Sequence, residues 1–416
     1  MLESTSEKRD NEQIGQKAEG LAKCFTPCRL NGLTLKNRFI KAGTYEGMTP
    51  NGNVSAPLRS FHQRIARGGI AMTTIGYCAV EPDGRLNENM LYMHEGLRGP
   101  LSEMIAELHQ SGTKVSGQMG HGGGFSKNRE LKRRRPLGPS FAINGLGVGR
   151  GMFFCDPMTQ HDINEFIRAY ADAARFMKSV GFDALEIHFG HGYGLCQFIS
   201  PKTNKRTDQY GGSLVNRMRL PLQVLAAVRH AVGDDFPLLA KISLTEGVKG
   251  GLHYDDAVAV SQLLAKGGID GIITSGGTST MNPMMMFRGD SFLKPMIKTE
   301  KNWLMKLLLA FYGPAMFRDY PYRELYFLEQ ASKIRDAVDC KMIYVGGASS
   351  NDSFAALMAR GFDFIQLGRS LLSDPDLPLK AQQQPDFQSR CLHCNECVAT
   401  IEHPQGIHCT RFQTPT

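Results

Sequence analysis

Three side chains capable of acid–base chemistry lie close together after a short apolar stretch, ALEIH. His188 ends this stretch, and His191 and Tyr193 follow within five residues, separated by glycines. An imidazole N–H can polarise a carbonyl oxygen, and a phenol with a pKa of about 10 can protonate a carbanion. This set would suit addition of hydride and a proton across an activated double bond. The spacing alone equally allows a histidine pair that only satisfies loop hydrogen bonds, or two metal ligands.

The sequence around these residues repeats one pattern that could form their scaffold. Eight short apolar runs end in Gly, Ser or His, at 39–43, 71–76, 115–120, 184–188, 238–243, 271–277, 342–347 and 364–370. Most are continuously apolar, which is typical of strands buried on both faces of a parallel sheet. Helical patterns lie between them, at 164–180, 214–232, 255–266, 325–338 and 353–360. The alternation predicts an α/β fold, a (β/α)8 TIM barrel, with a doubly wound open sheet as the alternative.

Three connections are long, at 120–184, 189–212 and 278–322, and in a barrel the loops after the strands build the active site. The last loop is expected to pack on the barrel rim or, alternatively, to form a lid over an apolar substrate; it holds Met281, Met284, Met285, Met286 and the only tryptophan, Trp303. We expect three segments: a flexible N-terminal tail at 1–23, the barrel at 24–385, and a cysteine-containing extension at 386–416.

The chain has 416 residues and a formal net charge of +8, but its basic residues are scattered apart from the run 132–135. A nucleic-acid binder would concentrate them on one patch with aromatic platforms, so no nucleic-acid partner is expected. The run itself is expected to be a solvated loop, or to steer an anionic cofactor. Neither a secretory signal nor a membrane-spanning apolar run is recognisable, which favours a cytoplasmic protein without a membrane partner. The ten cysteines are therefore expected to be reduced thiols or metal ligands.

The segment 184–217 resembles the signature of the old yellow enzyme family. The matching residues are His188, His191, Gly192, Tyr193, Gln197, Phe198, Ser200, Pro201, Asn204, Arg206, Asp208, Tyr210, Gly211, Gly212, Ser213, Asn216 and Arg217. Gly194 departs from the usual leucine. The resemblance extends over about 25–377 and includes all eight predicted strands.

This resemblance implies an FMN-dependent NAD(P)H oxidoreductase acting on an enone or enal. Residues matching His188 and His191 hydrogen-bond the substrate carbonyl oxygen in the family. The residue matching Tyr193 protonates Cα after hydride from flavin N5 reaches Cβ. NADPH or NADH loads the flavin first and then leaves, so no separate dinucleotide-binding domain is needed; a homo-oligomer is possible.

The same resemblance assigns the residues that hold the flavin ring. It places Ala42, Gly43 and Thr44 along the isoalloxazine, with Tyr77 as a further contact. Gln118 matches a glutamine that bonds the pyrimidine edge, where an amide offers both a donor and an acceptor.

Two positions depart from the family pattern. Tyr45 stands where a small or thiol residue is usual, and could narrow the pocket or alter the flavin potential. Lys241 stands where arginine is common near flavin N1 and O2; lysine keeps the positive charge but loses the planar fork.

The phosphate of the cofactor is expected at the ends of the last two strands. Glycines expose backbone N–H groups, and an arginine adds a fork of donors, which suits a phosphate near a helix start. The residues are Gly346, Gly347, Gly368 and Arg369. Their order matches the phosphate site of TIM barrels, after strands seven and eight.

Four cysteines follow the barrel with the spacing C-x2-C-x2-C-x11-C: Cys391, Cys394, Cys397 and Cys409. This spacing differs from the two-knuckle zinc pattern and favours an iron–sulfur cluster. It resembles the [4Fe–4S] motif of the dienoyl-CoA reductase and trimethylamine dehydrogenase branch, whose members continue into further nucleotide-binding domains. Structural zinc, with His393, His403 or His408 as substitute ligands, and ordinary thiols remain the alternatives.

Three functions are compatible with these patterns. The first is an ene-reductase for α,β-unsaturated carbonyl compounds. The alternative is an iron–sulfur flavoprotein that exchanges electrons with a separate protein partner, since no internal electron source is recognisable. The third is a flavin-binding barrel without enzymatic activity.

Overall fold

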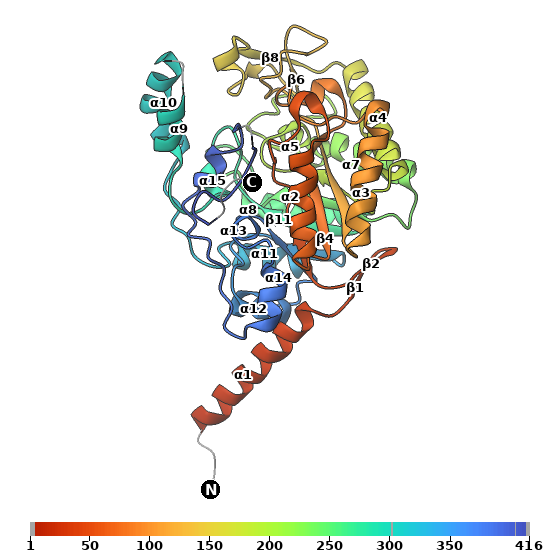
Figure 1. Cartoon of the computed structure of the whole chain (residues 1–416). Coiled ribbons are helices and arrows are strands. Elements are labelled where there is room, and N and C mark those ends of the chain that lie inside the picture. The colour runs from red at the N-terminus through yellow and green to blue at the C-terminus, as the bar shows by residue number, and fades with distance from the viewer. Residues whose placement is uncertain (1–4, 301–302, 404, 413–416) are drawn as a thin grey trace.

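The computed structural model describes residues 5–300, 303–403 and 405–412, and its centre is a closed barrel of eight parallel strands (Figure 1). In order around the barrel these are β3 (Phe39–Lys41), β4 (Met72–Ala79), β5 (Lys114–Gly120), β9 (Ala184–His188), β10 (Leu238–Ser243), β11 (Gly271–Ser275), β12 (Lys341–Tyr344) and β13 (Phe364–Leu367). Pairing of β13 with β3 closes the ring, which excludes the open sheet. The predicted TIM barrel is confirmed.

All eight predicted strands are present, with shifted ends. β4 continues to Ala79 and pairs with β5 across a register shift between Ile75 and Cys78. β12 ends at Tyr344, before the predicted end, because Gly346 and Gly347 have φ angles of +151° and +83° that a strand does not accommodate.

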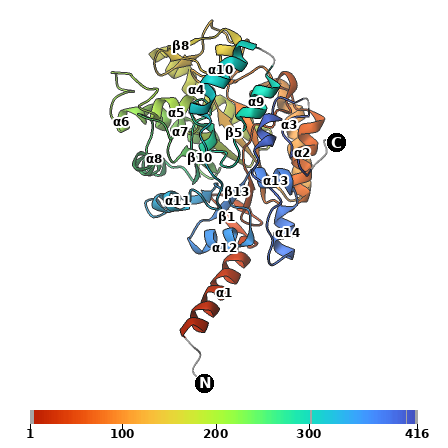
Figure 2. The ribbon, with the colours of Figure 1, turned by 90° about the vertical axis from the view of Figure 1, so that its left-hand side faces the viewer.

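Helices surround the barrel (Figure 2). They are α2 (Ala56–Arg67), α3 (Arg98–Gln110), α4 (Gln160–Ser179), α6 (Leu214–Arg217), α7 (Arg219–Val232), α8 (Tyr254–Lys266), α11 (Leu328–Arg335) and α12 (Asn351–Ala359). The α4 helix begins at a capping box, in which Thr159 and Asp162 satisfy each other's backbone N–H groups. Its apolar stripe, including Phe166 and Tyr170, is buried against the barrel. The predicted helix 214–232 is divided into α6 and α7 at Met218.

Shorter elements complete the chain. These are β1 (Cys28–Leu30), β2 (Leu33–Leu35), β6 (Leu137–Gly138), β7 (Ala142–Ile143), β8 (Phe154–Pro157), α5 (Gly194–Ile199), α9 (Leu293–Thr299), α10 (Trp303–Met316), α13 (Arg369–Ser373), α14 (Leu377–Gln383), α15 (Glu396–Ala399), and 3-10 turns at Pro50–Gly52, Pro82–Gly84, Glu95–Leu97, Val148–Arg150 and Pro283–Met285. The long loops thus carry β6–β8 and the α9–α10 hairpin. Among the described residues, no helix is both long and apolar enough to cross a membrane.

The segment expected to be a flexible tail is instead the helix α1 (Thr5–Cys24), so that expectation is corrected. Its C-terminal half packs on α12, where an added Cβ at Gly20 would lie 2.7 Å from the carbonyl oxygen of Ala355. Lys17 also pairs with Asp352 at 2.5 Å. The polar composition gave no sign of this helix because its contacts come from a helix more than 300 residues away in the sequence. Residues 1–4 lie outside the described part.

Candidate active site

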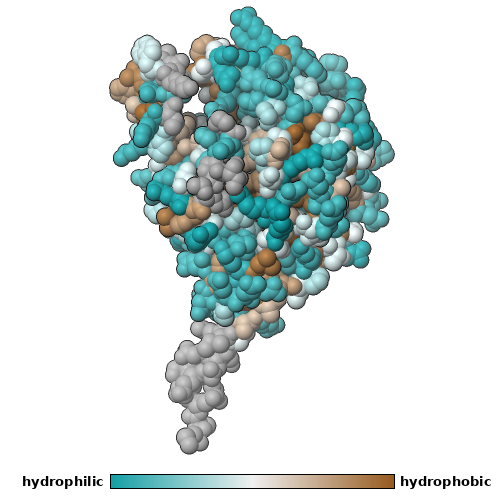
Figure 3. Space-filling view, in the orientation of Figure 1, coloured by the Kyte–Doolittle hydropathy of each residue, from teal (hydrophilic) through white to brown (hydrophobic). Residues whose placement is uncertain are grey.

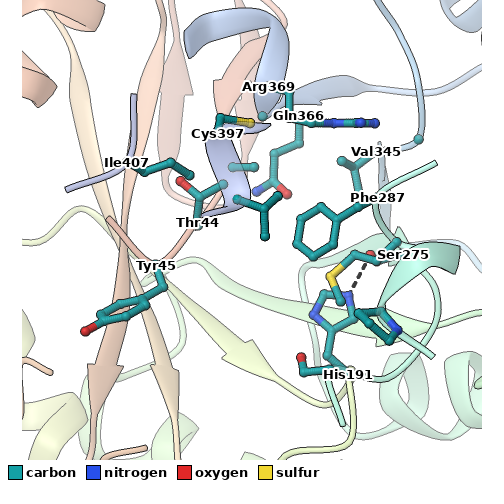
Figure 4. Close-up of a pocket in the computed structure, with 18 of the residues that line it drawn as sticks. Thr44, Tyr45, His191, Ser275, Phe287, Val345, Gln366, Arg369, Cys397 and Ile407 are labelled. Carbon is teal, nitrogen blue, oxygen red and sulfur yellow. Dashed lines mark hydrogen bonds between the residues drawn. The ribbon is translucent and has the colours of Figure 1, made fainter. Parts of the chain in front are cut away.

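A cavity of about 390 Å³ lies at the carboxyl ends of the barrel strands. Every residue predicted to be catalytic or to bind the flavin lines it: Ala42, Gly43, Thr44, Tyr77, Gln118, His188, His191, Tyr193, Lys241, Gly346, Gly347, Gly368 and Arg369. Figure 4 shows side chains from both ends of the sequence around this space, from Thr44 to Gln366 and Arg369. The barrel therefore brings together residues separated by more than 300 positions, while their chemical roles stay predictions.

The three catalytic candidates lie against one another. The ring of His188 lies 4.8 Å from that of His191 and 5.2 Å from that of Tyr193, measured between centroids. Nδ1 of His191 and Nε2 of His188 are 3.2 Å apart. Nε2 of His191 is 2.7 Å from Oγ of Ser275, the bond drawn in Figure 4.

These contacts define one consistent proton arrangement. The N–H of Gly190 donates to Nδ1 of His188 at 3.4 Å, which leaves the His188 proton on Nε2. His188 then donates to His191, and His191 donates to Ser275. Both imidazole N–H groups are thus occupied by protein acceptors here, so a substrate oxygen must replace at least one of them. Such bonds commonly rearrange when substrate binds.

Burial keeps both imidazoles neutral. It lowers the pKa of His188 to about 3 and that of His191 well below its usual value, and the positive charge of Lys241 lowers both further. Burial also raises the pKa of the Tyr193 phenol, an effect partly offset by its hydrogen bond to Ser279. At neutral pH all three groups therefore hold the protons that they would donate.

The lowered pKa values of His188 and His191 predict how both residues respond to pH. In protein labelled with ¹⁵N-histidine, the signals of His188 and His191 should keep their neutral chemical shifts from pH 8 to pH 5.

Because the folded pKa of His188 lies below the unfolded value of about 6.5, the unfolded chain takes up protons that the folded chain does not bind. The free energy of unfolding from these sites should therefore fall as the pH drops below about 6.5. NMR titration checks the first expectation, with His188→Ala and His191→Ala for assignment; a shift change near pH 6.5 at either site would contradict it.

A buried carboxylate organises the polar side of the cavity. Glu186 is 0% exposed and accepts hydrogen bonds from Nε2 of Gln118 at 2.5 Å, Nζ of Lys241 at 2.8 Å and Nε2 of Gln366 at 2.8 Å. The strand register makes this possible, because β5 and β9 pair Gln118 with Glu186. Three cavity-lining side chains on three strands are thus held by one residue.

The first segment predicted to contact the flavin lies beside a second buried ion pair. Lys41, at the end of β3, donates to Glu46, and the two flank the loop segment that carries Ala42, Gly43 and Thr44. Burial raises the pKa of Glu46 to about 7, against the opposing effect of Lys41. The pair thus ties together the two ends of the segment whose residues line the cavity.

The residues present fit an FMN molecule. Three residues that line the cavity each have a buried polar atom with no hydrogen-bond partner within the described residues: Oγ1 of Thr44, the hydroxyl of Tyr77 and Oε1 of Gln366. Unsatisfied buried polar groups are rare in folded proteins, so these atoms point to a polar ligand. Gln118 and Lys241 would face its pyrimidine edge.

At the other end of the cavity, glycines leave room that side chains would fill. A Cβ at Gly347 would lie 2.8 Å from the ring of Tyr326, whereas one at Gly368 would meet only Thr44, at 4.0 Å. Arg369 lines the same end and donates to the carbonyl oxygen of Arg288 at 2.8 Å. Backbone N–H groups and a guanidinium are the donors that a phosphate requires.

The two departures from the family pattern are both in the cavity wall. Lys241 is buried and pairs with Glu186. Tyr45 packs in the same apolar cluster as Tyr77 and Tyr193 and donates to Oδ1 of Asn87 at 3.2 Å. Its ring therefore occupies volume at the end of the cavity where Tyr193 lies.

The four C-terminal cysteines surround a second, smaller cavity of about 20 Å³: Cys391, Cys394, Cys397 and Cys409. A space of this size holds one water or ion and would have to open for a four-iron cluster. None of the four takes part in a disulfide bond. In the described chain, no group of three or more His, Cys, Asp or Glu residues has the geometry of a metal site. The four cysteines predicted to bind a metal thus line one small cavity, and the metal itself stays a prediction. His393, His403 and His408, the substitute ligands considered for zinc, do not line this cavity.

Sequence reasoning missed Gln366 and Ser275, which line the cavity, and Glu186, which binds three of the lining side chains. Glu186 and His188 alternate along β9, so both point into the barrel, and a glutamate inside an apolar strand was a usable signal. Gln366 interrupts the apolar strand β13 in the same way. Ser275 gave no such signal, because a serine that ends a strand is common in any loop.

The chain is similar to known flavin enzymes. The profile of the NADH:flavin oxidoreductase / NADH oxidase family matches residues 23–283. A 4,4'-dithiodibutanoate disulfide reductase of Rhodococcus erythropolis is 38% identical over 380 residues, covering 91% of this chain and 92% of that protein. A metal reductase of Desulforamulus reducens is 29% identical over 390 residues; these are 92% of this chain and 52% of that protein, so the chain spans about half the length of this relative.

Solved structures share the fold. A 2-naphthoyl-CoA reductase complex superposes with a TM-score of 0.78 at 21% identity, covering 95% of this chain and 57% of that one. The match of the family profile to more than half of the chain, together with a relative matched over nearly its whole length, shows that the chain belongs to the NADH:flavin oxidoreductase / NADH oxidase family.

Proposed function

We propose that this flavin oxidoreductase reduces activated C=C bonds of α,β-unsaturated carbonyl compounds, with NADPH or NADH as reductant. One observation carries the proposal: His188, His191 and Tyr193 meet at one end of a cavity whose remaining walls fit FMN. Neutral imidazoles and a protonated phenol are the groups that this chemistry needs.

Each of the three residues has a distinct task. The N–H groups of His188 and His191 hold the carbonyl oxygen and withdraw electrons from the conjugated alkene. FMN, when bound beside Gln118 and Lys241, would supply the hydride that the β carbon receives. The hydroxyl of Tyr193 gives its proton to the α carbon, so hydride and proton together saturate the double bond. Solvent then reprotonates the phenolate.

The rest of the cavity favours an apolar substrate. Met286, Phe287, Phe292 and Phe317 line its outer part. Phe292 is 5% and Phe317 is 7% exposed, and their rings lie 5.0 Å apart between centroids. These side chains exclude water, which strengthens the hydrogen bonds from the histidines.

Half-reactions of the purified protein test the proposal. Without oxygen, NADPH or NADH should bleach the flavin absorbance, and cyclohexenone should restore it with formation of cyclohexanone. Because a relative is a disulfide reductase, 4,4'-dithiodibutanoate is the competing acceptor. Bleaching followed by reoxidation with the disulfide but not with cyclohexenone would overturn the ene-reductase assignment.

A second function is favoured by the position of the cysteines. The two cavities share Arg369, Leu372 and Cys397 in their walls, so the four thiols adjoin the proposed flavin site. A metal centre there, an iron–sulfur cluster above all, would suit electron exchange with a separate protein partner.

Metal analysis tests this second function. Protein purified without oxygen should contain iron and sulfide if the cysteines hold a cluster, or zinc if the site is structural. Either metal should be lost in Cys394→Ser but retained in Cys340→Ser, which removes a free cysteine outside the site. Absence of both metals from the parent protein would leave the cysteines as ordinary thiols.

A further inference from the structure

Helix α10 exposes an apolar stripe that the active site does not use. Trp303, Leu307 and Phe311 are 75%, 49% and 76% exposed, and Tyr312 is 73% exposed. Residues four apart lie on one helix face, so the first three form a continuous stripe. Figure 1 shows the α9–α10 hairpin standing out from the barrel, and Figure 3 shows hydrophobic surface over α10 at the upper left. Contiguous exposed apolar surface of this kind marks an interaction site.

The other side of the same hairpin covers the cavity. Leu309 of α10 and Met296 of α9 pack with Phe292 and Phe317. Met296, Phe292 and Phe317 also line the cavity. The stripe is therefore separated from the substrate cavity by the thickness of one hairpin.

The apolar stripe is accompanied by positive charge. Between residues 293 and 316, which form the hairpin, the sequence contains a single carboxylate, Glu300, and four lysines, at 294, 298, 301 and 306. Lys294, Lys298 and Lys306 are exposed. A helix with Trp, Leu and Phe on its surface and lysines around them is typical of segments that lie in the headgroup region of anionic bilayers.

The charge and shape of the α9–α10 hairpin favour one kind of binding partner over the others. In a two-fold dimer formed through α10, the exposed lysines of one hairpin would lie against the same lysines of the other copy. This repulsion disfavours a second chain as the partner. An acidic protein would match the charge, but the stripe lies on a protruding helix that offers a partner no groove. A bilayer matches the charge, the convex shape and the nearby apolar cavity together.

We propose that the α9–α10 hairpin docks the protein peripherally on anionic lipid surfaces, with Trp303, Leu307 and Phe311 in the interface. Docking there would bring the apolar cavity to the bilayer, whichever acceptor the active site reduces. The proposal departs from the expectation of no membrane partner, which rested on the lack of a spanning segment. Exposure of α10 is visible only in the folded chain.

Trp303 is the only tryptophan, so its fluorescence reports directly on α10. Mixing the flavin-loaded protein with vesicles of phosphatidylcholine and phosphatidylserine should shift the emission to shorter wavelength. Phosphatidylcholine alone should give little shift, and high salt should reverse the shift because it screens the lysines. Sedimentation of the protein with the vesicles measures binding independently.

Two sets of variants keep the tryptophan as probe. The triple variant Lys294→Gln/Lys298→Gln/Lys306→Gln should bind about 100-fold more weakly, at roughly 1 kcal/mol per basic residue. Leu307→Ser/Phe311→Ser should also abolish the shift, whereas Val215→Ser, at a site 65% exposed on α6, should not change it. Retained flavin absorbance shows that each variant is folded.

Four outcomes would overturn the proposal. These are no shift with any vesicle, an equal shift with neutral and anionic vesicles, a lipid-independent shift that grows with protein concentration, and a shift with polyglutamate but not with vesicles. The third would identify a second copy as the occupant, and the fourth an acidic protein.

Discussion

Replacing Tyr193 with phenylalanine should slow alkene reduction by about 10²–10⁴-fold, the usual contribution of a positioned general acid. The phenol is the only one of the three catalytic candidates that would lose a proton to carbon. Phenylalanine keeps the aromatic ring, whose centroid lies 5.2 Å from that of His188 and 5.8 Å from that of Tyr77. The cavity should therefore keep its shape. Stopped-flow measurement of the two half-reactions checks this: reduction by NAD(P)H should be unchanged and reoxidation by cyclohexenone slow.

Two controls separate proton donation from structural damage. Tyr92→Phe removes a hydroxyl from a tyrosine that packs against the same apolar cluster without lining the cavity, and should be neutral. A quinone, whose reduction needs no protonation at carbon, should reoxidise Tyr193→Phe at the parent rate. Equal slowing with the quinone and the enone would remove Tyr193 from the proton-donor role.

Replacing Glu186 with leucine should destabilise the protein by about 3–5 kcal/mol, because it leaves the buried charge of Lys241 without its partner. Gln118 and Gln366 would also lose their common acceptor, so their amides would no longer be held toward the flavin. Weaker FMN binding should therefore accompany the loss of stability. Urea unfolding of the flavin-free protein and FMN titration measure the two effects separately.

A double variant distinguishes the charge effect from the positioning effect. Glu186→Leu/Lys241→Met removes both charges and should recover most of the stability, but FMN affinity should stay low. Glu246→Gln is the matched control. Glu246 is equally buried and accepts hydrogen bonds from Ser200 and Leu252. Neither of these partners lines the cavity, whereas all three partners of Glu186 do, so FMN affinity should not change in this control. Undiminished FMN affinity in Glu186→Leu would show that Glu186 supports the fold alone.

The sequence predicted an element correctly wherever its local residue pattern is compatible with only one kind of secondary structure. Continuous apolar runs predicted all eight strands, because a parallel strand covered on both faces must be apolar along its length. The ends of the strands were less predictable: Gly346 and Gly347 leave the strand through backbone angles that no composition rule specifies. The helix α1 was missed because its polar sequence has few apolar contacts of its own, and its stabilising neighbour is α12.

The sequence by itself determined the family, the barrel and the catalytic and flavin-contact candidates that line the cavity, because motif, strand order and glycine positions are all local. Tertiary structure alone decided how those residues act on one another. Closure of the barrel brings Glu186 to Gln118, Lys241 and Gln366 and places the cysteines beside Arg369. It also directs the proton of His188 toward His191 and that of His191 toward Ser275. It also leaves the stripe on α10 facing solvent. Burial, pairing and exposure depend on which distant residues meet, and the one-dimensional sequence does not contain those distances.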